Sequence, residues 1–372
     1  MKNKIKYGLL FLLKLIRLLS KFNKFRYIVF IHDAHKHGAQ ILGLNIVKEI
    51  EILHGQDSCL AILLNGGPME KEFNKHNSII VQPYIRRCSQ LVSILINNEC
   101  KLIYNSAVSH RVYEYFAKAN RKTTSLVHEL PSLISEYKLG PLFNNFKGDS
   151  IIFPSEYVKK RFITEVSSVI NSKIFIKPQG SYLKENPNEE SDLRQKHGIP
   201  KNAFIVYNMA YGDLRKGLDI FIKAANEYIS TYGSDIYFIW FGNIELSLRV
   251  WMENDIQLLG LSKNIIIEGF QDKPSLAIKE CNCFFLTSRE DPYPSTVIDA
   301  VGMKINCVLF DDGNGYIGKV SRFLYFTPYL NTQKSIKRIF DLKNGIDLNP
   351  TDSKEDELVT SIKDYASFIT GF

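Results

Sequence analysis

Two carboxylates flank a segment of the chain that could bind a phosphorylated ligand. Cys281–Leu286 is a short apolar run that predicts a buried strand, and the charged, proline-containing residues after it cannot continue that strand. Asp291 lies in this loop, and Ser295 or Thr296 can cap a helix in which Asp299 lies about one turn from the start. Amide groups at a helix start attract anions, phosphate above all. Together with acids that can hold hydroxyl groups, they fit a nucleotide-sugar, whereas an isolated acid pair would be better explained as part of an ordinary capped helix.

Two cations follow another predicted strand of the same half of the chain. Ala203–Asn208 is predicted as a strand, and Arg215 and Lys216 come after it in a turn that precedes a predicted helix. Arg can hold a phosphate through two parallel hydrogen bonds, whereas Lys supplies a point charge. Because the carboxyl ends of parallel strands meet at one edge of a sheet, we expect both cations near Asp291 and Asp299. By itself, such a pair would be better explained as a solvated basic turn.

The first predicted strand, Tyr27–Ile31, is followed by a histidine-rich turn. This turn contains His32, Asp33 and Gly38 and precedes a predicted helix. Strand, glycine-containing turn and helix form an anion-binding arrangement, although the G-x-G-x-x-G dinucleotide fingerprint is absent. The histidines of the turn have no cluster of carboxylates or cysteines around them, so we predict no metal site.

A second histidine–acid pair, His128-Glu129, follows the predicted strand Ser125–Val127. Its side chains should emerge at the carboxyl end of the sheet, where ligands bind in parallel α/β folds. Taken alone, a histidine in this place is more often a structural residue.

Short apolar runs alternate with helical segments along the whole chain, which indicates parallel, doubly wound sheets. The further runs predicted as strands are Ser58–Leu64, Ile79–Val81, Leu102–Tyr104, Ile151–Phe153, Ile236–Phe241 and Asn264–Glu268. A length of 372 residues suggests about two domains. The polar, proline-containing Asn186–Glu190 is predicted to join them, and Asp352–Phe368 is predicted as a terminal helix.

The loop with the two acids resembles a known family signature. Ser288-Arg-Glu-Asp-Pro-Tyr-Pro-Ser-Thr-Val-Ile-Asp-Ala300 is similar to the S-R-E-D-P-F-P-x-V-V-x-E-A element of the family 4 glycosyltransferases, which have the GT-B fold. The acid-x7-Glu element of that family becomes Asp291-x7-Asp299, with the second acid one methylene shorter. Arg215-Lys216-Gly217 resembles its R-K-G element, and His128-Glu129 its H-E element.

The resemblance implies a retaining, metal-independent hexosyltransferase that uses a nucleotide-sugar as co-substrate and needs no cofactor. The catalytic residues it implies are His128, Arg215, Lys216 and Asp291. The donor-binding residues it implies are Gly38, Arg215, Lys216, Asp291, Pro294, Ser295, Thr296 and Asp299. The acceptor-side residues it implies are His32, Asp33 and Glu129. Two alternatives remain open: a nucleotide-sugar epimerase of the same fold, and a non-catalytic, membrane-associated binding protein.

The implied fold is α/β, with two Rossmann-like domains that face each other across a cleft. We expect an N-terminal acceptor-side domain at 27–180 and a nucleotide-sugar domain at 181–350. Residues 351–372 are expected to form a helix that, in this family, often crosses back to the first domain. We expect the acceptor to be a glycan or a lipid-linked saccharide of cell-surface polysaccharide or lipopolysaccharide synthesis, because the basic beginning of the chain suits an anionic membrane.

The charge of the chain is concentrated at its beginning. The net charge of +8 equals the number of cations in residues 1–26, which contain no acid. The rest of the chain is near neutral, which argues against a nucleic-acid-binding domain. The six cysteines show no CxxC pair and no metal-ligand spacing, so a reducing cytoplasm is the default.

Residues 1–26 are predicted to form a detachable, basic, amphipathic arm. Tyr7–Phe22 is predicted as a helix, and its uninterrupted apolar run is far shorter than the ~20 residues that span a bilayer. Four cations recur at steps of three and four residues and share one face of this helix. They are Lys14, Arg17, Lys21 and Lys24. We expect the apolar side in the acyl boundary and the basic side on anionic head groups, at the inner face of the cell membrane. The alternative is a helix packed on the body of the protein.

Overall fold

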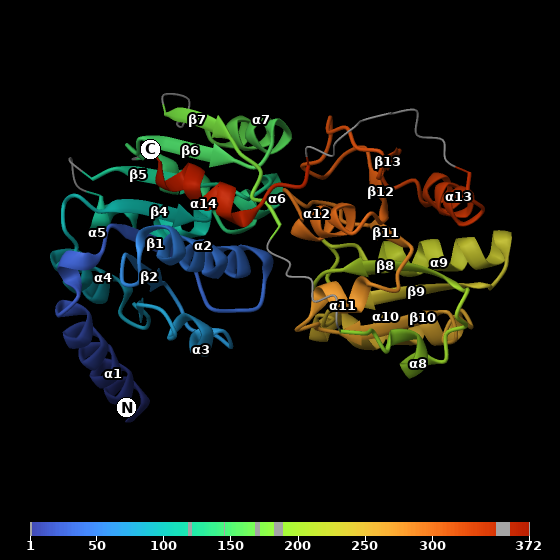
Figure 1. Cartoon of the computed structure of the whole chain (residues 1–372), viewed down its shortest axis with the longest axis horizontal. Coiled ribbons are helices and arrows are strands. Elements are labelled where there is room, and N and C mark those ends of the chain that lie inside the picture. Colours follow the sequence, from blue (N-terminus) through green and yellow to red (C-terminus); the bar gives the residue numbers. More distant parts are fainter. Residues whose placement is uncertain are drawn as a thin grey trace. The chain divides into compact units, whose positions relative to one another are not determined.

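The computed structural model describes residues 2–117, 121–144, 146–167, 172–181, 189–346 and 358–371. The chain divides into two compact units, Met1–Gly180 with Thr360–Phe372, and Ser181–Val359 (Figure 1). The first three residues of the expected interdomain segment, 186–188, and the expected start of the terminal helix, 352–357, lie outside the described residues.

The first unit is built on a seven-stranded parallel sheet with the order β3-β2-β1-β4-β5-β6-β7. Its strands are β1 (Tyr27–Ile31), β2 (Cys59–Leu63), β3 (Ser78–Ile80), β4 (Lys101–Asn105), β5 (Thr123–Leu126), β6 (Ser150–Phe153) and β7 (Lys173–Ile176). Every residue of β2 and β4 is buried, as expected when helices cover both faces of a parallel sheet.

Helices follow most of these strands and cover the sheet. The α-helices of this unit are α1 (Lys2–Leu19), α2 (Gly38–His54), α3 (Glu70–Phe73), α4 (Ile85–Leu95), α5 (Tyr113–Phe116), α6 (Pro131–Glu136), α7 (Glu156–Glu165) and α14 (Ile362–Thr370). Short 3-10 turns are η1 (Phe22–Lys24), η2 (Ala107–Val112) and η3 (Gly140–Phe143). Among the described residues, no helix combines the length and the apolar character needed to cross a membrane.

The second unit is built on a six-stranded parallel sheet with the order β10-β9-β8-β11-β12-β13. Its strands are β8 (Phe204–Met209), β9 (Ile236–Phe241), β10 (Ile265–Gly269), β11 (Cys283–Leu286), β12 (Asn306–Phe310) and β13 (Leu324–Thr327). Its helices are α8 (Leu193–His197), α9 (Leu218–Tyr232), α10 (Leu246–Leu258), α11 (Pro274–Ile278), α12 (Ser295–Gly302) and α13 (Thr332–Lys343).

Three expectations differ from this fold. The N-terminal helix begins at Lys2 rather than Tyr7, and it belongs to the first unit instead of forming a detached arm. Helix α12 is capped by Pro294 without a side-chain hydrogen bond, so neither Ser295 nor Thr296 is the capping residue. Their hydroxyl groups were expected to accept from the helix start, but both residues already lie inside the first turn.

Candidate functional site

The strand order of the second unit creates one point where ligands can approach the strand ends. From β8 the chain moves outward to β9 and β10, and then returns to the other side of β8 with β11. The loops after β8 and β11 therefore leave the carboxyl edge of the sheet in opposite directions, and this is the place where sheets of this kind bind ligands. The loop after β8 carries Arg215 and Lys216, and the loop after β11 carries Asp291.

Lys216 and Asp291 meet at this point. The ammonium group of Lys216 forms an ion pair with Asp291 Oδ2, and both side chains are largely buried. Burial lowers the pKa of Lys216, while the negative charge of Asp291 acts in the opposite direction. The backbone of Lys216 is held as well, since its amide donates to Asp213 Oδ1 at 2.6 Å and its carbonyl accepts from Thr287 Oγ1 at 3.2 Å.

Arg215 joins the same two loops. Its Nη1 donates to the carbonyl of Glu290 at 2.8 Å, and its own carbonyl accepts from the amide of Arg289 at 2.8 Å. Arg289 in turn donates two hydrogen bonds to Asp219 on α9, at 2.9 and 2.7 Å. The two loops are thus joined by several bonds, which orders the cations before any ligand binds.

The glycine-rich turn after β12 fixes Asp291 from the other side. The amide of Asp291 donates to the carbonyl of Gly313 at 2.7 Å, and its carbonyl accepts from the amide of Gly315 at 3.2 Å. A side chain at position 315 would come within 1.7 Å of the carbonyl oxygen of Pro292, so only glycine fits there. Ser288 Oγ donates to Asp291 Oδ2 at 3.2 Å, and no described residue donates to Oδ1. One carboxylate oxygen is therefore left to accept from a ligand.

Helix α12 begins four residues after Asp291. Tyr316 donates from its hydroxyl to the carbonyl of Pro294 at 2.7 Å and stacks on Tyr293 at 4.2 Å, which sets the start of the helix. Ser295 and Thr296 are half-buried, and their amides are among those that have no carbonyl to bond within the helix. This helix start is the anion-attracting end predicted from the sequence.

Asp299 has a hydrogen-bond partner of its own. It is buried, with 8% exposure, and its Oδ1 accepts a hydrogen bond from Ser181 Oγ at 2.8 Å. Burial raises the pKa of Asp299 to about 7, although the bond from Ser181 acts in the opposite direction. The assignment of Asp299 to a ligand hydroxyl therefore stays a prediction, and the structure supplies a competing partner in Ser181.

The first unit has its own switch point, between β1 and β4. His32 and Asp33 follow β1, and Gln40 on α2 lies between them: its Nε2 is 2.7 Å from His32 Nε2 and 2.6 Å from Asp33 Oδ1. Burial opposes ionisation of Asp33, but hydrogen bonds from the amide of His35 and from Gln40 hold its pKa below the usual value. Burial lowers the pKa of His32, which favours its neutral form. Gln40 is buried, and its Oε1 has no partner among the described residues.

Gly38 is the first residue of α2, and a side chain there would meet nothing within 4 Å. Packing therefore does not require glycine at this position, whereas a ligand close to the backbone would. The helix start is anchored by Asn105 at the end of β4, whose Nδ2 donates to the carbonyl of Ala39 at 2.7 Å.

His128 and Glu129 follow β5 and differ in their surroundings. Glu129 is buried, and its carboxylate accepts from the amides of Ala107 and His128 at 3.0–3.1 Å, which ties the loop after β4 to the loop after β5. Burial raises the pKa of Glu129. Both ring nitrogens of His128 lack a partner among the described residues, and burial lowers its pKa to about 4. The two ring nitrogens of a neutral His128 could thus bond to a ligand, while Glu129 holds together the loops after β4 and β5.

Three polar residues near the strand ends of the two units were not singled out from the sequence. Gln40 and Ser288 lie inside the segments that were recognised, so their positions next to the predicted residues were a usable signal. Ser181 is 118 residues away from its partner Asp299, and no local pattern marks it. In the described part of the chain, no group of three His, Cys, Asp or Glu side chains could hold a metal ion.

Comparison with solved structures identifies the fold. The fold is similar to that of HepE of Anabaena, solved in complex with UDP. The match covers 93% of this chain and 100% of the HepE chain, with a TM-score of 0.72 and 17% sequence identity. Sucrose-phosphate synthase of Thermosynechococcus elongatus matches 93% of the chain over 98% of its own, with a TM-score of 0.72 and 14% identity. WaaG, a glycosyltransferase involved in lipopolysaccharide biosynthesis, covers 93% of the chain and 100% of its own, with a TM-score of 0.65 and 12% identity. The two parallel-sheet units therefore have the GT-B-like fold of these proteins.

The sequence of the second unit matches a known family model. Residues 189–323, about a third of the chain, match the model described as glycosyl transferases group 1. An uncharacterized glycosyltransferase of Methanocaldococcus jannaschii is 25% identical over 173 residues, which is 46% of this chain and 42% of the relative. The match thus spans less than half the length of that curated relative.

Proposed function

We propose that the chain transfers a sugar from a nucleotide-sugar donor to a glycan or lipid-linked acceptor, with retention of configuration. The observation that carries this proposal is the buried Lys216–Asp291 pair at the β8/β11 switch point, on the loop that leads into α12. A cation, a carboxylate oxygen that can accept from a hydroxyl group and the start of a helix are the groups that a sugar diphosphate requires.

The cations would act on the leaving group. As the bond between the anomeric carbon and the phosphate oxygen breaks, its electron pair stays on the diphosphate, and negative charge grows there. Arg215, Lys216 and the amides near Ser295 and Thr296 would stabilise that charge without having to reorganise, since the loops already hold them in place. An ammonium group has three donors, so Lys216 can keep its bond to Asp291 and still reach a phosphate.

Asp291 suits the binding of a sugar hydroxyl better than nucleophilic attack, because its Oδ2 already accepts from Lys216 and Ser288. Attack by the acceptor hydroxyl from the side that the diphosphate leaves accounts for retention: the acceptor oxygen bonds to the anomeric carbon, and its proton passes to the leaving phosphate. His128 is assigned to the donor sugar, Pro294 and Asp299 to the nucleotide, and Gly38 to the donor phosphate. His32 and Asp33 are assigned to the acceptor, with Glu129 positioning the loops around them.

The acceptor and pathway are proposed from the beginning of the chain. Residues 1–26, with eight cations and no acid, would hold the enzyme at the inner, anionic face of a cell membrane, where lipid-linked glycans of surface polysaccharide or lipopolysaccharide are built. Solved complexes of HepE contain UDP and UDP-glucose, so UDP-sugars are the first donors to test for this chain.

The test is a donor-hydrolysis and transfer screen over UDP-, GDP- and ADP-sugars. Replacing both Arg215 and Lys216 by Ala should lower turnover at least ~100-fold, as removal of preorganised charge does in other enzymes. The matched control is Lys223→Ala on α9, an exposed lysine paired with Glu227 at 3.7 Å, which should leave turnover unchanged. Full activity in the double variant would refute the proposal, and conversion of donor without any acceptor product would favour an epimerase.

A further inference from the structure

The N-terminal helix, expected to have an apolar side toward lipid and a basic side toward head groups, has an exposed apolar surface. Six large aliphatic side chains along α1 are between 46% and 63% exposed. They are Leu9, Leu10, Leu12, Leu13, Ile16 and Leu19, which we call the aliphatic ridge. The opposite side of the helix packs on the first unit, where Leu18 is buried and Phe11 and Leu15 contact the core. Figure 1 shows α1 (dark blue) extending from one edge of that unit.

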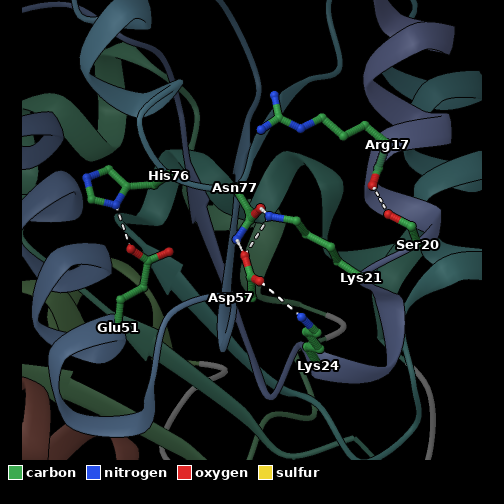
Figure 2. Close-up of polar contacts among 8 residues, drawn as sticks. All are labelled: Arg17, Ser20, Lys21, Lys24, Glu51, Asp57, His76 and Asn77. Carbon is green, nitrogen blue, oxygen red and sulfur yellow. Dashed lines mark hydrogen bonds and ion pairs between the residues drawn. The ribbon is translucent and has the colours of Figure 1, made fainter.

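The lysines expected to face lipid head groups contact the protein instead. Lys21 Nζ donates to Asp57 Oδ1 at 2.6 Å and to Asn77 Oδ1 at 3.2 Å, and Lys24 Nζ is 3.4 Å from Asp57 Oδ2 (Figure 2). Lys14 Nζ donates to Asn74 Oδ1 at 2.6 Å. We call the group Lys21, Lys24, Asp57 and Asn77 the lysine latch.

Asp57 is the centre of the latch. It has a positive φ of 73°, which Asp tolerates better than most residues, and it lies in the turn between α2 and β2. The hydrogen bond from Lys21, together with the one from Asn77, lowers the pKa of Asp57 to about 2. The latch is therefore charged at any physiological pH, and it ties the segment after α1 to the turn between α2 and β2.

From this geometry we infer that the aliphatic ridge is the lipid-contacting surface of the protein, and that the lysine latch holds Lys21 and Lys24 on the first unit, away from the head groups. This inference rests on the membrane contact proposed above and specifies its surface. The occupant is the acyl boundary of an anionic bilayer. Arg17, the exposed cation beside the ridge, would lie at the head groups.

A second copy of the chain fits the ridge less well. Six half-exposed side chains offer roughly a few hundred Å², whereas a stable interface buries about 800 Å² per partner. Residues 1–26 contain no acid, so pairing two ridges would bring together cations without any opposite charge. Anionic head groups supply the complementary charge that a second copy lacks.

The first experiment is co-sedimentation of the full chain with vesicles of phosphatidylcholine, with and without phosphatidylglycerol, in the absence of donor. The ridge variant is Leu9→Gln/Leu13→Gln/Ile16→Gln, which keeps helix-forming side chains and removes three exposed apolar ones. We expect the wild type to pellet with both kinds of vesicle, more with the anionic kind, and the ridge variant to lose at least ~10-fold in affinity for both. An unchanged unfolding midpoint would show that this variant is folded.

The matched control removes three equally exposed apolar side chains from α10 of the second unit. These are Leu246, Val250 and Leu258, which are 83%, 71% and 76% exposed. The variant Leu246→Gln/Val250→Gln/Leu258→Gln should pellet like the wild type. Equal pelleting of the ridge variant and the wild type, or an equal loss in the α10 variant, would overturn the inference.

The latch is tested by Asp57→Gly, which keeps the positive φ favourable while it removes the carboxylate. Because Lys21 and Lys24 are then able to reach head groups, we expect several-fold tighter binding to anionic vesicles and a steeper loss of binding with salt. The matched control, Glu156→Ala on α7, changes the net charge equally and releases Lys159, its partner at 3.0 Å, elsewhere on the same unit. Weaker binding, or an unchanged salt dependence, for Asp57→Gly would show that the latch does not hold these lysines away from lipid.

The outcomes separate this inference from the proposed function. If the wild type pellets with neither vesicle, the membrane contact fails and the ridge assignment fails with it, while sugar transfer is unaffected. If the wild type and the ridge variant pellet equally, the contact stands and only its assignment to the ridge is wrong.

Discussion

At the scale of single residues, Asp291 and Asp299 of the second unit are both buried carboxylates, but their charges are compensated differently. Asp291 is paired with the ammonium group of Lys216, and Ser288 donates a further hydrogen bond to it. Asp299 accepts instead from the hydroxyl of Ser181, and no cation among the described residues pairs with it. An unpaired buried acid favours the protonated form, because a charge without a counter-charge is costly to remove from water.

This difference predicts a pH-dependent stability. The pKa of Asp299 is raised from 3.8 to about 7, so the folded state holds its proton more tightly than the unfolded state does. The free energy of unfolding should therefore fall as the pH rises from about 4 to about 7, and stay level above that. Asp299→Asn cannot ionise, so its advantage over the wild type should grow across this range by up to about 4 kcal/mol.

Urea unfolding of both proteins over a series of pH values measures this difference. Ser181→Ala is a second probe. Its hydrogen bond favours the charged form of Asp299, so its loss should raise the pKa of Asp299 further and move the pH range over which stability falls to higher pH. Parallel pH profiles for Asp299→Asn and the wild type would show that Asp299 is ionised in the folded protein at all these pH values.

At the scale of elements, the loop after β8 depends on one glycine. Gly217 has a φ of 74°, and a side chain there would come within 2.0 Å of the carbonyl oxygen of Thr287. That carbonyl belongs to the loop after β11, so the two loops that carry Lys216 and Asp291 touch at this point. Close approach of the backbones here is what brings the cation and the acid together.

Gly217→Ala should therefore disturb both stability and binding. The strained conformation costs about 1–2 kcal/mol, and the displaced Thr287 carbonyl should weaken UDP binding at least ~10-fold. The control is Gly260→Ala, which has a similar φ of 70° but nothing within 4 Å of the new side chain. Gly260→Ala should lose only the stability that the positive φ costs an alanine, and its affinity for UDP should be that of the wild type. Thermal unfolding and calorimetry measure the two effects, and equal UDP affinities for both variants would contradict the role assigned to the contact.

At the scale of the whole molecule, each unit has its own hydrophobic core, and the end of the chain returns to the first unit. Helix α14 packs on α2, with Tyr365, Ala366 and Ile369 buried and Thr370 Oγ1 3.2 Å from His54 Nε2. Helix α14 therefore stabilises the first unit, which is otherwise formed by residues 1–180.

Ile369→Ala should destabilise the first unit by about 2–5 kcal/mol, the usual cost of a buried Ile truncated to Ala. Hydrogen exchange should become faster in α2, while α9 of the second unit keeps its protection, because the two units have separate cores. Lys363→Ala, at an exposed position of the same helix, is the control and should change neither. Faster exchange in α9 as well would mean that the two units unfold together.

The sequence was most informative where apolar runs are long and continuous. The bounds predicted for β1 and β9 agree with the structure, because a strand buried on both faces needs an unbroken apolar run. The strands β7 and β13 and the helix α13 were not predicted. Lys173–Ile176 is an edge strand with little burial, so its pattern is weak.

What the sequence determined by itself was the alternation of strands and helices, and the motifs at the strand ends. These are local properties, set by hydrophobic period and by turn and helix-start chemistry, and they were enough to place Arg215, Lys216 and Asp291 at one edge of a parallel sheet. The tertiary structure decided which of these groups meet: it paired Lys216 with Asp291 across 75 residues, and Asp299 with Ser181 across 118. It also set Lys14, Lys21 and Lys24 against the first unit and left six aliphatic side chains of α1 exposed, since contacts between distant segments depend on packing that no local pattern encodes.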